Sequence, residues 1–226
     1  KNRAFLEANL SGVELAKWKY QRYIKDYLRC VASVDDNIGR LLDYLDEHGL
    51  TENTVIIYTS DQGFYLGEHG WYDKRFMYEE SLGMPLIIRY PQEISAGMTL
   101  DEMVLNLDFC PTILDYAGVE VPAEIQGESL RSLLRGHPSP QWRQMIYYHY
   151  YEYPHGWHDV KRHYGIRTQK FKLIHFYDDI DAKELYNLQQ DPHELNNVYG
   201  LAQLNGIQNE LETQLQELKK YYMDYE

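Results

Sequence analysis

The chain has 226 residues and a formal net charge of −13, with 44% hydrophobic and 25% charged residues. This length and composition are typical of one sizeable globular core, or of a core with a small appendage. The acidic balance argues against nucleic acid as a partner, because a phosphate backbone requires clustered basic residues. No segment is long and apolar enough to span a membrane.

The first half of the chain predicts alternating helices and strands. Apolar residues recur with helical spacing over residues 15–48, and Gly49 ends the pattern. Residues 55–59, Val-Ile-Ile-Tyr-Thr, form a continuous β-branched run that is typical of a buried parallel strand. A second strand is expected over residues 85–91 and a helix over residues 103–117. This order indicates an α/β fold.

The pattern changes after His137-Pro-Ser-Pro140, a turn-rich segment that is the best candidate for a domain boundary. Short strand-like runs separated by turns follow, and the chain ends on an amphipathic helix. We therefore expect two domains, residues 1–140 and residues 141–226. The strand-like runs cover 145–151, 163–168, 171–177 and 184–188, and the final helix covers 207–222, with an apolar stripe of Leu204, Ile207, Leu211, Leu215 and Leu218.

Polar residues follow the strand at 55–59. Asp61 and Gln62 come just beyond its carboxyl end, where sites form in open α/β sheets. Their carboxylate and amide oxygens suit a hard cation such as calcium. Lys74 could reach an anion held over that cation. The alternative is that Asp61 caps a turn and that Lys74 is a solvated surface charge, and the residue types alone do not separate the two interpretations.

Five short segments follow one another in the first half of the chain: Thr59-Ser-Asp-Gln-Gly63, Leu66-Gly-Glu-His-Gly70, Asp73-Lys-Arg75, Tyr78-Glu-Glu-Ser81 and Pro85-Leu-Ile-Ile-Arg-Tyr-Pro91. Taken in order, they resemble the sulfatase family of the alkaline-phosphatase-like superfamily. Residues 167–197 are similar to the small C-terminal sulfatase subdomain, and the resemblance extends over nearly the whole chain. It implies the second half of an alkaline-phosphatase-like α/β sandwich, through about residue 140, followed by a small α+β subdomain.

The resemblance also implies residue roles. Asp61 matches a catalytic aspartate that is a metal ligand, and Gln62 matches the neighbouring ligand of the same divalent cation, Ca²⁺. Lys74 matches the catalytic lysine that holds a sulfate oxygen and assists departure of the leaving group. His69 lies in the same loop. It either lines the sulfate pocket or fixes the loop structurally.

A second cluster lies in the Tyr-rich stretch after residue 145. The family subdomain can supply substrate contacts, and arginine, histidine and aromatic side chains suit sugars and anionic groups. We therefore expect His158, Arg162 and His163 to bind substrate. The alternative is a loop with exposed charges. Metal binding by these histidines is a weaker interpretation, because no ligand spacing is clean.

Family members use a formylglycine made from a [Cys/Ser]-x-[Pro/Ala]-x-Arg motif. Here Cys30-Val-Ala-Ser-Val34 lacks the arginine and Ser139-Pro-Gln-Trp-Arg143 has glutamine in the middle. The pair Asp35-Asp36 falls in the long helical pattern and indicates a solvated helix face. The chain begins with Lys-Asn-Arg-Ala, without an initiator Met or apolar leader. We therefore expect an incomplete fragment, inactive alone, whose partner is the missing N-terminal half of the catalytic domain.

In the complete protein the resemblance implies hydrolysis of a sulfate ester on a carbohydrate. N-acetylglucosamine-6-sulfate or a related glycosaminoglycan sugar is the expected substrate, and the periplasm or secretion is the expected location. One alternative is a phosphodiesterase or phosphonate hydrolase of the same superfamily, with a Ser or Thr nucleophile and usually two metals. Another is a non-catalytic carbohydrate-binding remnant.

Overall fold

The computed structural model describes residue 3, residues 9–154 and residues 159–225. The chain divides into two compact units. The first comprises residues 1–54, 65–73 and 90–92, and the second comprises residues 55–64, 74–89 and 93–226. Among the residues described, no helix has the length and apolar character needed to cross a membrane.

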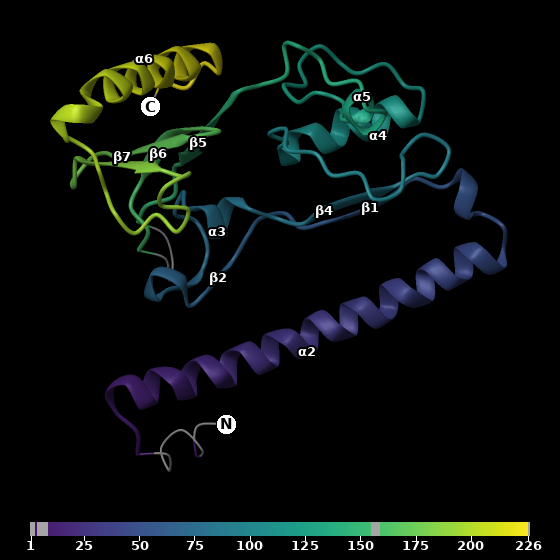
Figure 1. The fold of residues 1–226 in the computed structure, drawn as a ribbon, viewed down its shortest axis with the longest axis horizontal. Coiled ribbons are helices and arrows are strands. Elements are labelled where there is room, and N and C mark those ends of the chain that lie inside the picture. Colours follow the sequence, from purple (N-terminus) through teal and green to yellow (C-terminus); the bar gives the residue numbers. More distant parts are fainter. Residues whose placement is uncertain (1–2, 4–8, 155–158, 226) are drawn as a thin grey trace. The chain divides into compact units, whose positions relative to one another are not determined.

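The first unit is built on one long helix, α2 (Gly12–Glu47), which continues into the 3₁₀ turn η1 (Thr51–Asn53) (Figure 1). The helical pattern predicted over residues 15–48 is confirmed. Asp35 and Asp36 are exposed on it, as expected for a solvated face. A short antiparallel hairpin of β2 (Tyr65–Leu66) and β3 (Tyr72–Asp73), joined by η2 (Glu68–Gly70), belongs to the same unit.

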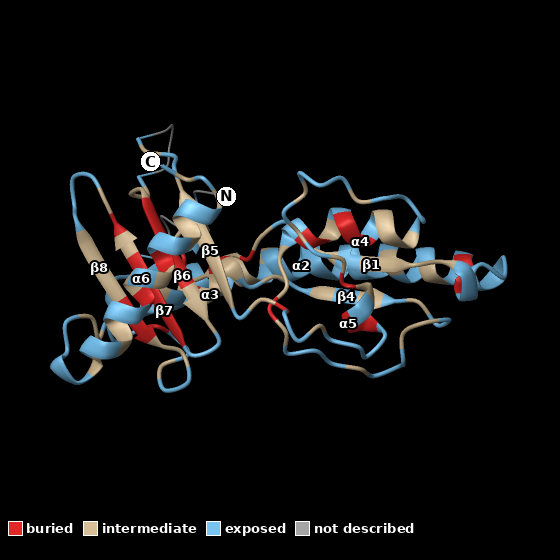
Figure 2. Cartoon of the chain, turned by 90° about the horizontal axis from the view of Figure 1, so that it is seen from above, coloured by how far each residue is buried: buried red, intermediate tan, exposed pale blue. Residues whose placement is uncertain are grey.

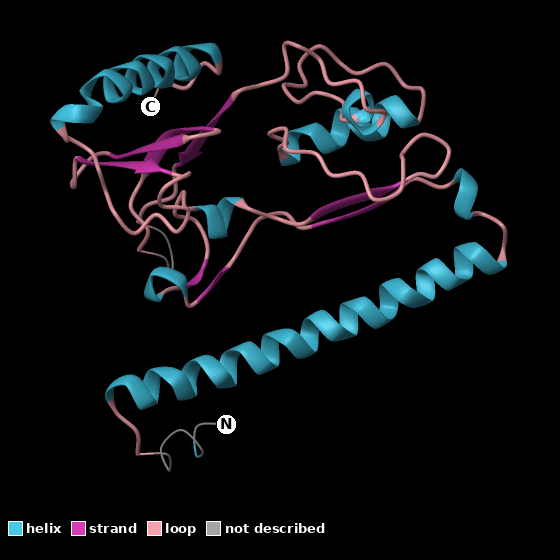
Figure 3. Ribbon diagram, viewed as in Figure 1, coloured by secondary structure: helices cyan, strands magenta, loops and turns pink. Residues whose placement is uncertain are grey.

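In the second unit β1 (Ile56–Thr59) pairs with β4 (Leu86–Arg89), and both predicted strands are confirmed (Figure 3). The pair is antiparallel, with Ile56 opposite Arg89, so the expectation of a parallel neighbour for residues 55–59 is wrong for this pair. The strand is also only partly buried. A β-branched apolar run predicts a strand with buried side chains, but it does not determine whether the neighbouring strand is parallel or antiparallel.

The second unit also contains short helices. They are α3 (Glu79–Leu82), α4 (Phe109–Tyr116) after the turn η3 (Asn106–Asp108), and α5 (Arg131–Leu134). A small core of Leu130, Leu133, Leu134 and Trp142 lies here, against Leu86 and Ile88 of β4, and Figure 2 shows buried segments in α4 and α5. The helix predicted over residues 103–117 is observed only as α4, because residues 103–108 form an extended stretch and a 3₁₀ turn.

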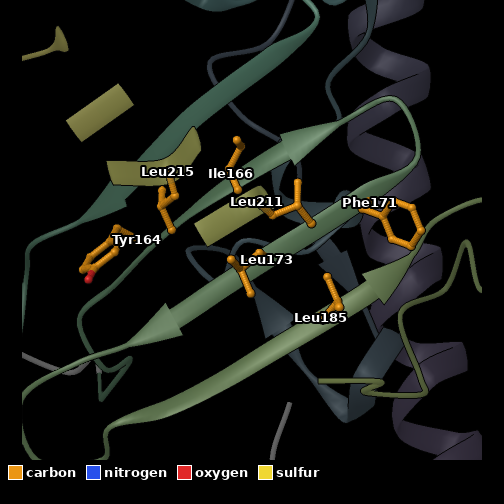
Figure 4. Close-up of a cluster of buried hydrophobic side chains, with 7 residues drawn as sticks. All are labelled: Tyr164, Ile166, Phe171, Leu173, Leu185, Leu211 and Leu215. Atoms are coloured by element: carbon orange, nitrogen blue, oxygen red, sulfur yellow. The ribbon is translucent and has the colours of Figure 1, made fainter. Parts of the chain in front are cut away.

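The described residues of the segment 145–221 form a four-stranded antiparallel meander covered by one helix. The strands are β5 (Met145–Tyr150), β6 (His163–Thr168), β7 (Phe171–Phe176) and β8 (Ala182–Asn187), in that spatial order. Helix α6 (Asn205–Tyr221), preceded by η4 (Ala202–Leu204), lies on one face. Its buried Leu211 and Leu215 meet Ile166, Leu173 and Leu185 of the sheet (Figure 4). The predicted apolar stripe is confirmed.

Candidate active site

A cavity of about 470 Å³ lies in the second unit, between the loops that follow β1 and strand β5. Three residues singled out in the sequence, Asp61, Gln62 and Lys74, line this one cavity although they come from two separate loops. The remaining lining residues are Arg75, Glu79, Ser81, Leu82, Gly83, Met84, Met103, Val104, Leu105, Asn106, Leu107, Ile146, Tyr147, Tyr148, Tyr150 and Arg167.

The loop that carries Asp61 and Gln62 is pressed against helix α3. The Gly63 N–H donates to the Ser81 carbonyl oxygen at 2.9 Å. A Cβ atom at Gly63 would lie 2.1 Å from the carbonyl oxygen of Glu80, so this close approach requires glycine. The two oxygen-bearing side chains therefore start from a backbone position that packing against α3 determines.

The far wall of the cavity comes from β5 and β6. Tyr147, Tyr148 and Tyr150 of β5 line it together with Arg167 of β6. The Arg167 guanidinium makes two hydrogen bonds to the Glu79 carboxylate, Nε to Oε1 and Nη2 to Oε2, each 3.1 Å long. The wall thus combines aromatic surfaces with one bidentate ion pair, which is a surface suited to a sugar ring with polar substituents.

Glu79 also belongs to a buried ion network. The Lys172 ammonium, which is 0% exposed, lies 2.8 Å from Glu79 Oε1 and 2.7 Å from Glu194 Oε1. Burial opposes ionisation of Glu79, but hydrogen bonds from Arg167 and Lys172 outweigh it and lower the pKa of Glu79 to about 2. Burial raises the pKa of Glu194, and its ion pair with Lys172 only partly opposes this. The network ties β6 and β7 to α3 beside the cavity.

The residues expected to bind substrate are placed differently from one another. Arg162 is partly exposed, donates from Nε to the Tyr151 carbonyl oxygen at 2.8 Å and pairs with Asp178 at 3.3 Å, and it is not among the cavity-lining residues. His158 lies outside the described residues. His69 belongs to the first unit, where its ring packs against Tyr65 and Trp71, a placement that fits a structural role in the loop.

His163, which the sequence analysis expects to bind substrate, is buried in this structure. Its side chain is 0% exposed and its ring packs among aromatic rings, with centroids 5.0 Å from Phe176, 5.5 Å from Tyr150 and 5.7 Å from Tyr148. The cause is its position at the start of β6, because residues 163–166 of this central strand are buried on both faces of the sheet.

His149, from the same Tyr-rich stretch, is likewise internal. It is 2% exposed, it shares a hydrogen bond with Asp224 near the chain end, and its Nε2 lies 2.7 Å from the Tyr177 hydroxyl. This cluster anchors the segment after α6 to β5. The histidine excess of the stretch therefore serves packing at these two positions.

Tyr148, Tyr150, Arg167 and Glu79, which line the same cavity, were not expected as site residues. Alternation along residues 145–150 would have placed Tyr148 and Tyr150 on one face of the strand. The pairing of Arg167 with Glu79 bridges 88 positions in the chain and gives no local signal.

The fit to a metal ion is partial. Across the described stretches there is no group of three or more His, Cys, Asp or Glu side chains arranged to hold a metal ion. Asp61 and Gln62 supply two oxygen donors at the cavity, which is the donor type that a hard cation requires. A full coordination shell needs further oxygen ligands.

Two family models match the chain. The model described as "Sulfatase" matches residues 4–119, and the model described as "N-sulphoglucosamine sulphohydrolase, C-terminal" matches residues 67–221. The chain belongs to the sulfatase family, and its fold is that of the alkaline-phosphatase-like superfamily.

Among curated proteins, N-acetylglucosamine-6-O-sulfatase from Bacteroides thetaiotaomicron is 57% identical over 222 residues, covering 97% of this chain and 40% of the relative. The solved structure of BT4656 in complex with its substrate D-glucosamine-2-N,6-O-disulfate superposes with a TM-score of 0.94 at 56% identity, covering 99% of this chain and 46% of that chain. The structure of a phosphonate monoester hydrolase of Agrobacterium radiobacter superposes with a TM-score of 0.74 at 26% identity. The match covers 84% of this chain and 40% of that chain. The chain thus spans less than half the length of these relatives.

Proposed function

We propose that this chain is part of a sulfuric ester hydrolase that acts on a sulfated amino sugar, with the ester at position 6. One observation carries the proposal: Asp61, Gln62 and Lys74 line one cavity in a chain that is 56% identical to a protein solved with D-glucosamine-2-N,6-O-disulfate. The much lower identity to a phosphonate monoester hydrolase, 26%, favours sulfate over phosphonate esters.

Each residue has a definite task in this proposal. Asp61 and Gln62 would hold a divalent cation, Ca²⁺, which when bound supplies positive charge to the sulfate oxygens. The Lys74 ammonium binds a sulfate oxygen and neutralises the negative charge that develops as the ester bond breaks. The nucleophile, a formylglycine, would come from the part of the relatives that this chain does not span.

The segment 141–226 would act as a subdomain that faces the sugar. Its tyrosines at 147, 148 and 150 and Arg167 line the same cavity as Lys74, which supports a role in holding the ring that bears the sulfate. Arg162 and His158 remain candidates for contacts with more distant sugar groups. A periplasmic or secreted location would match a polymeric sulfated substrate.

The test is sulfate release by the full gene product that contains this chain. N-acetylglucosamine-6-sulfate and D-glucosamine-2-N,6-O-disulfate are the substrates, and a phenyl phosphonate monoester is the comparison. Lys74→Ala should lower kcat/KM for the sulfate esters by about a hundredfold, because one pre-organised charge is lost from the transition state.

Lys170→Ala is the matched control, because Lys170 is an exposed lysine on the turn between β6 and β7 that does not line the cavity. Undiminished activity in Lys74→Ala would contradict the assignment of Lys74. Faster turnover of the phosphonate ester than of either sulfate ester would contradict the proposed reaction. Sugar binding without turnover by the full gene product would indicate the non-catalytic alternative.

A further inference from the structure

Lys74 stands between two residues with unusual backbone conformations. Asp73 has φ of 107° and Arg75 has φ of 102°. Non-glycine residues rarely adopt such angles, and the angles persist only where contacts with the surrounding structure hold the backbone in place. The contacts that hold this backbone therefore determine where the Lys74 side chain begins.

Two hydrogen bonds hold the Arg75 peptide groups on opposite sides. The Arg75 N–H donates to Ser81 Oγ at 2.9 Å, and the Tyr148 hydroxyl donates to the Arg75 carbonyl oxygen at 2.7 Å. Ser81 is 6% exposed. Burial raises the pKa of Tyr148 to about 12, so that its hydroxyl keeps the proton it donates at neutral pH. The two partners come from α3 and β5, so the Arg75 backbone is held between these two elements.

Ser81 also holds the other loop of the cavity. Its carbonyl oxygen accepts the Gly63 N–H at 2.9 Å, directly after Gln62, while its hydroxyl accepts the Arg75 N–H, directly after Lys74. One residue of α3 therefore links the backbone that carries Asp61 and Gln62 to the backbone that carries Lys74. A displacement of Ser81 would change the spacing between the two charged ends of the cavity.

We infer that Ser81 and Tyr148 are positioning residues of the sulfatase reaction. They hold the strained Arg75 backbone and so place the Lys74 ammonium relative to Asp61 and Gln62. This inference rests on the proposed function, because it assigns Lys74 to the sulfate group. It also gives strand β5, outside the loops that carry the charged residues, a direct part in assembling the site.

A double-mutant cycle on the full gene product tests the inference. Tyr148→Phe should lower kcat/KM for N-acetylglucosamine-6-sulfate by about tenfold, the effect of losing one buried hydrogen bond, and should weaken inhibition by inorganic sulfate in parallel. In a Lys74→Ala background the same substitution should change kcat/KM by less than about twofold, because its effect acts through Lys74.

Ser81 provides an independent pair of variants. Ser81→Ala should lower kcat/KM, and Ser81→Thr, which keeps the Oγ acceptor, should recover most of the loss. Tyr199→Phe is the matched control, because the Tyr199 hydroxyl donates to Glu212 of α6 and Tyr199 does not line the cavity. Its kcat/KM should equal that of the unaltered protein.

The outcomes distinguish a failure of the positioning role from a failure of the proposed function. If Lys74→Ala lowers activity but Tyr148→Phe costs the same factor with and without Lys74, the positioning role is overturned while the proposed function stands. If Lys74→Ala has no effect, the proposed function fails and the positioning role fails with it. Should Tyr148→Phe not fold, equal activity of Ser81→Ala and Ser81→Thr would overturn the inference on its own.

Discussion

At the scale of single residues, His163 is the clearest source of pH dependence. Burial lowers its pKa to about 4, and the hydrogen bond of Nδ1 with the Lys161 carbonyl oxygen only partly offsets this. The unfolded chain takes up a proton near pH 6.5, whereas the folded protein resists it until about pH 4. Stability should therefore fall as the pH drops from 6.5 to 4, by about 3 kcal/mol from this group.

The prediction is checked by urea unfolding of the full gene product at several pH values. His163→Gln should flatten the dependence of the unfolding free energy on pH between 7 and 4, relative to the unaltered protein. His193→Gln, at an exposed position, should leave the slope unchanged. Equal slopes for all three proteins would show that His163 does not titrate in this way.

Some site residues could be predicted from the sequence and others could not. Asp61, Gln62 and Lys74 are recognisable because they fall in an ordered series of short segments that resembles the sulfatase pattern. Buried Asp108 pairs with Arg143, a contact that depends on how two separate segments pack and leaves no local trace. For the same reason, composition alone could not show that His163 is internal.

At the scale of elements, α6 owes its place to two leucines. Leu211 and Leu215 are 4% and 3% exposed and pack on the sheet. Leu215→Ala should destabilise the folded protein by about 3 kcal/mol, through lost burial and the cavity left behind. Glu217→Ala, an exposed position of the same helix, is the control and should change stability little. Equal thermal midpoints for the two variants would contradict this account of the helix.

Periodicity explains which elements could be predicted. Helices α2 and α6 and strands β5 to β8 were all expected near their observed positions, because spacing of apolar residues follows the geometry of each element directly. The antiparallel direction of β1 relative to β4 was not expected, because the pairing of strands depends on the whole sheet. The helix expected at 103–117 was shortened because Asp108 accepts hydrogen bonds from the backbone N–H groups of Leu105 and Glu128, which stabilises the preceding turn instead.

At the scale of the whole molecule, much apolar surface is uncovered within each unit. Leu28 and Leu41 of α2 are each 54% exposed, and Ile87 of β4 is 64% exposed. Such surfaces, and the free edges of a two-stranded sheet, favour association. The polypeptide of residues 1–226, expressed by itself, should therefore self-associate or aggregate.

Light scattering coupled to size-exclusion chromatography measures this directly. Replacing Leu28 and Leu41 with glutamate should reduce the associated fraction, because the added charges oppose burial of the helix face. Glutamate at two exposed polar positions of the same helix, Ser33 and Asn37, serves as the control. A monodisperse, stably folded monomer of the unaltered polypeptide would contradict the prediction.

The buried Lys172 has a consequence for recombination between relatives. Its charge is compensated by Glu194 and by Glu79, which lie on opposite sides of the segment 137–140 in the sequence. A chimaera that takes residues 141–226 from one homologue and the rest from another would bury an under-compensated ammonium wherever Glu79 is not carried along, at a cost of several kcal/mol. Exchange at the turn-rich segment 137–140 would therefore be tolerated only between homologues that both keep the partners of Lys172.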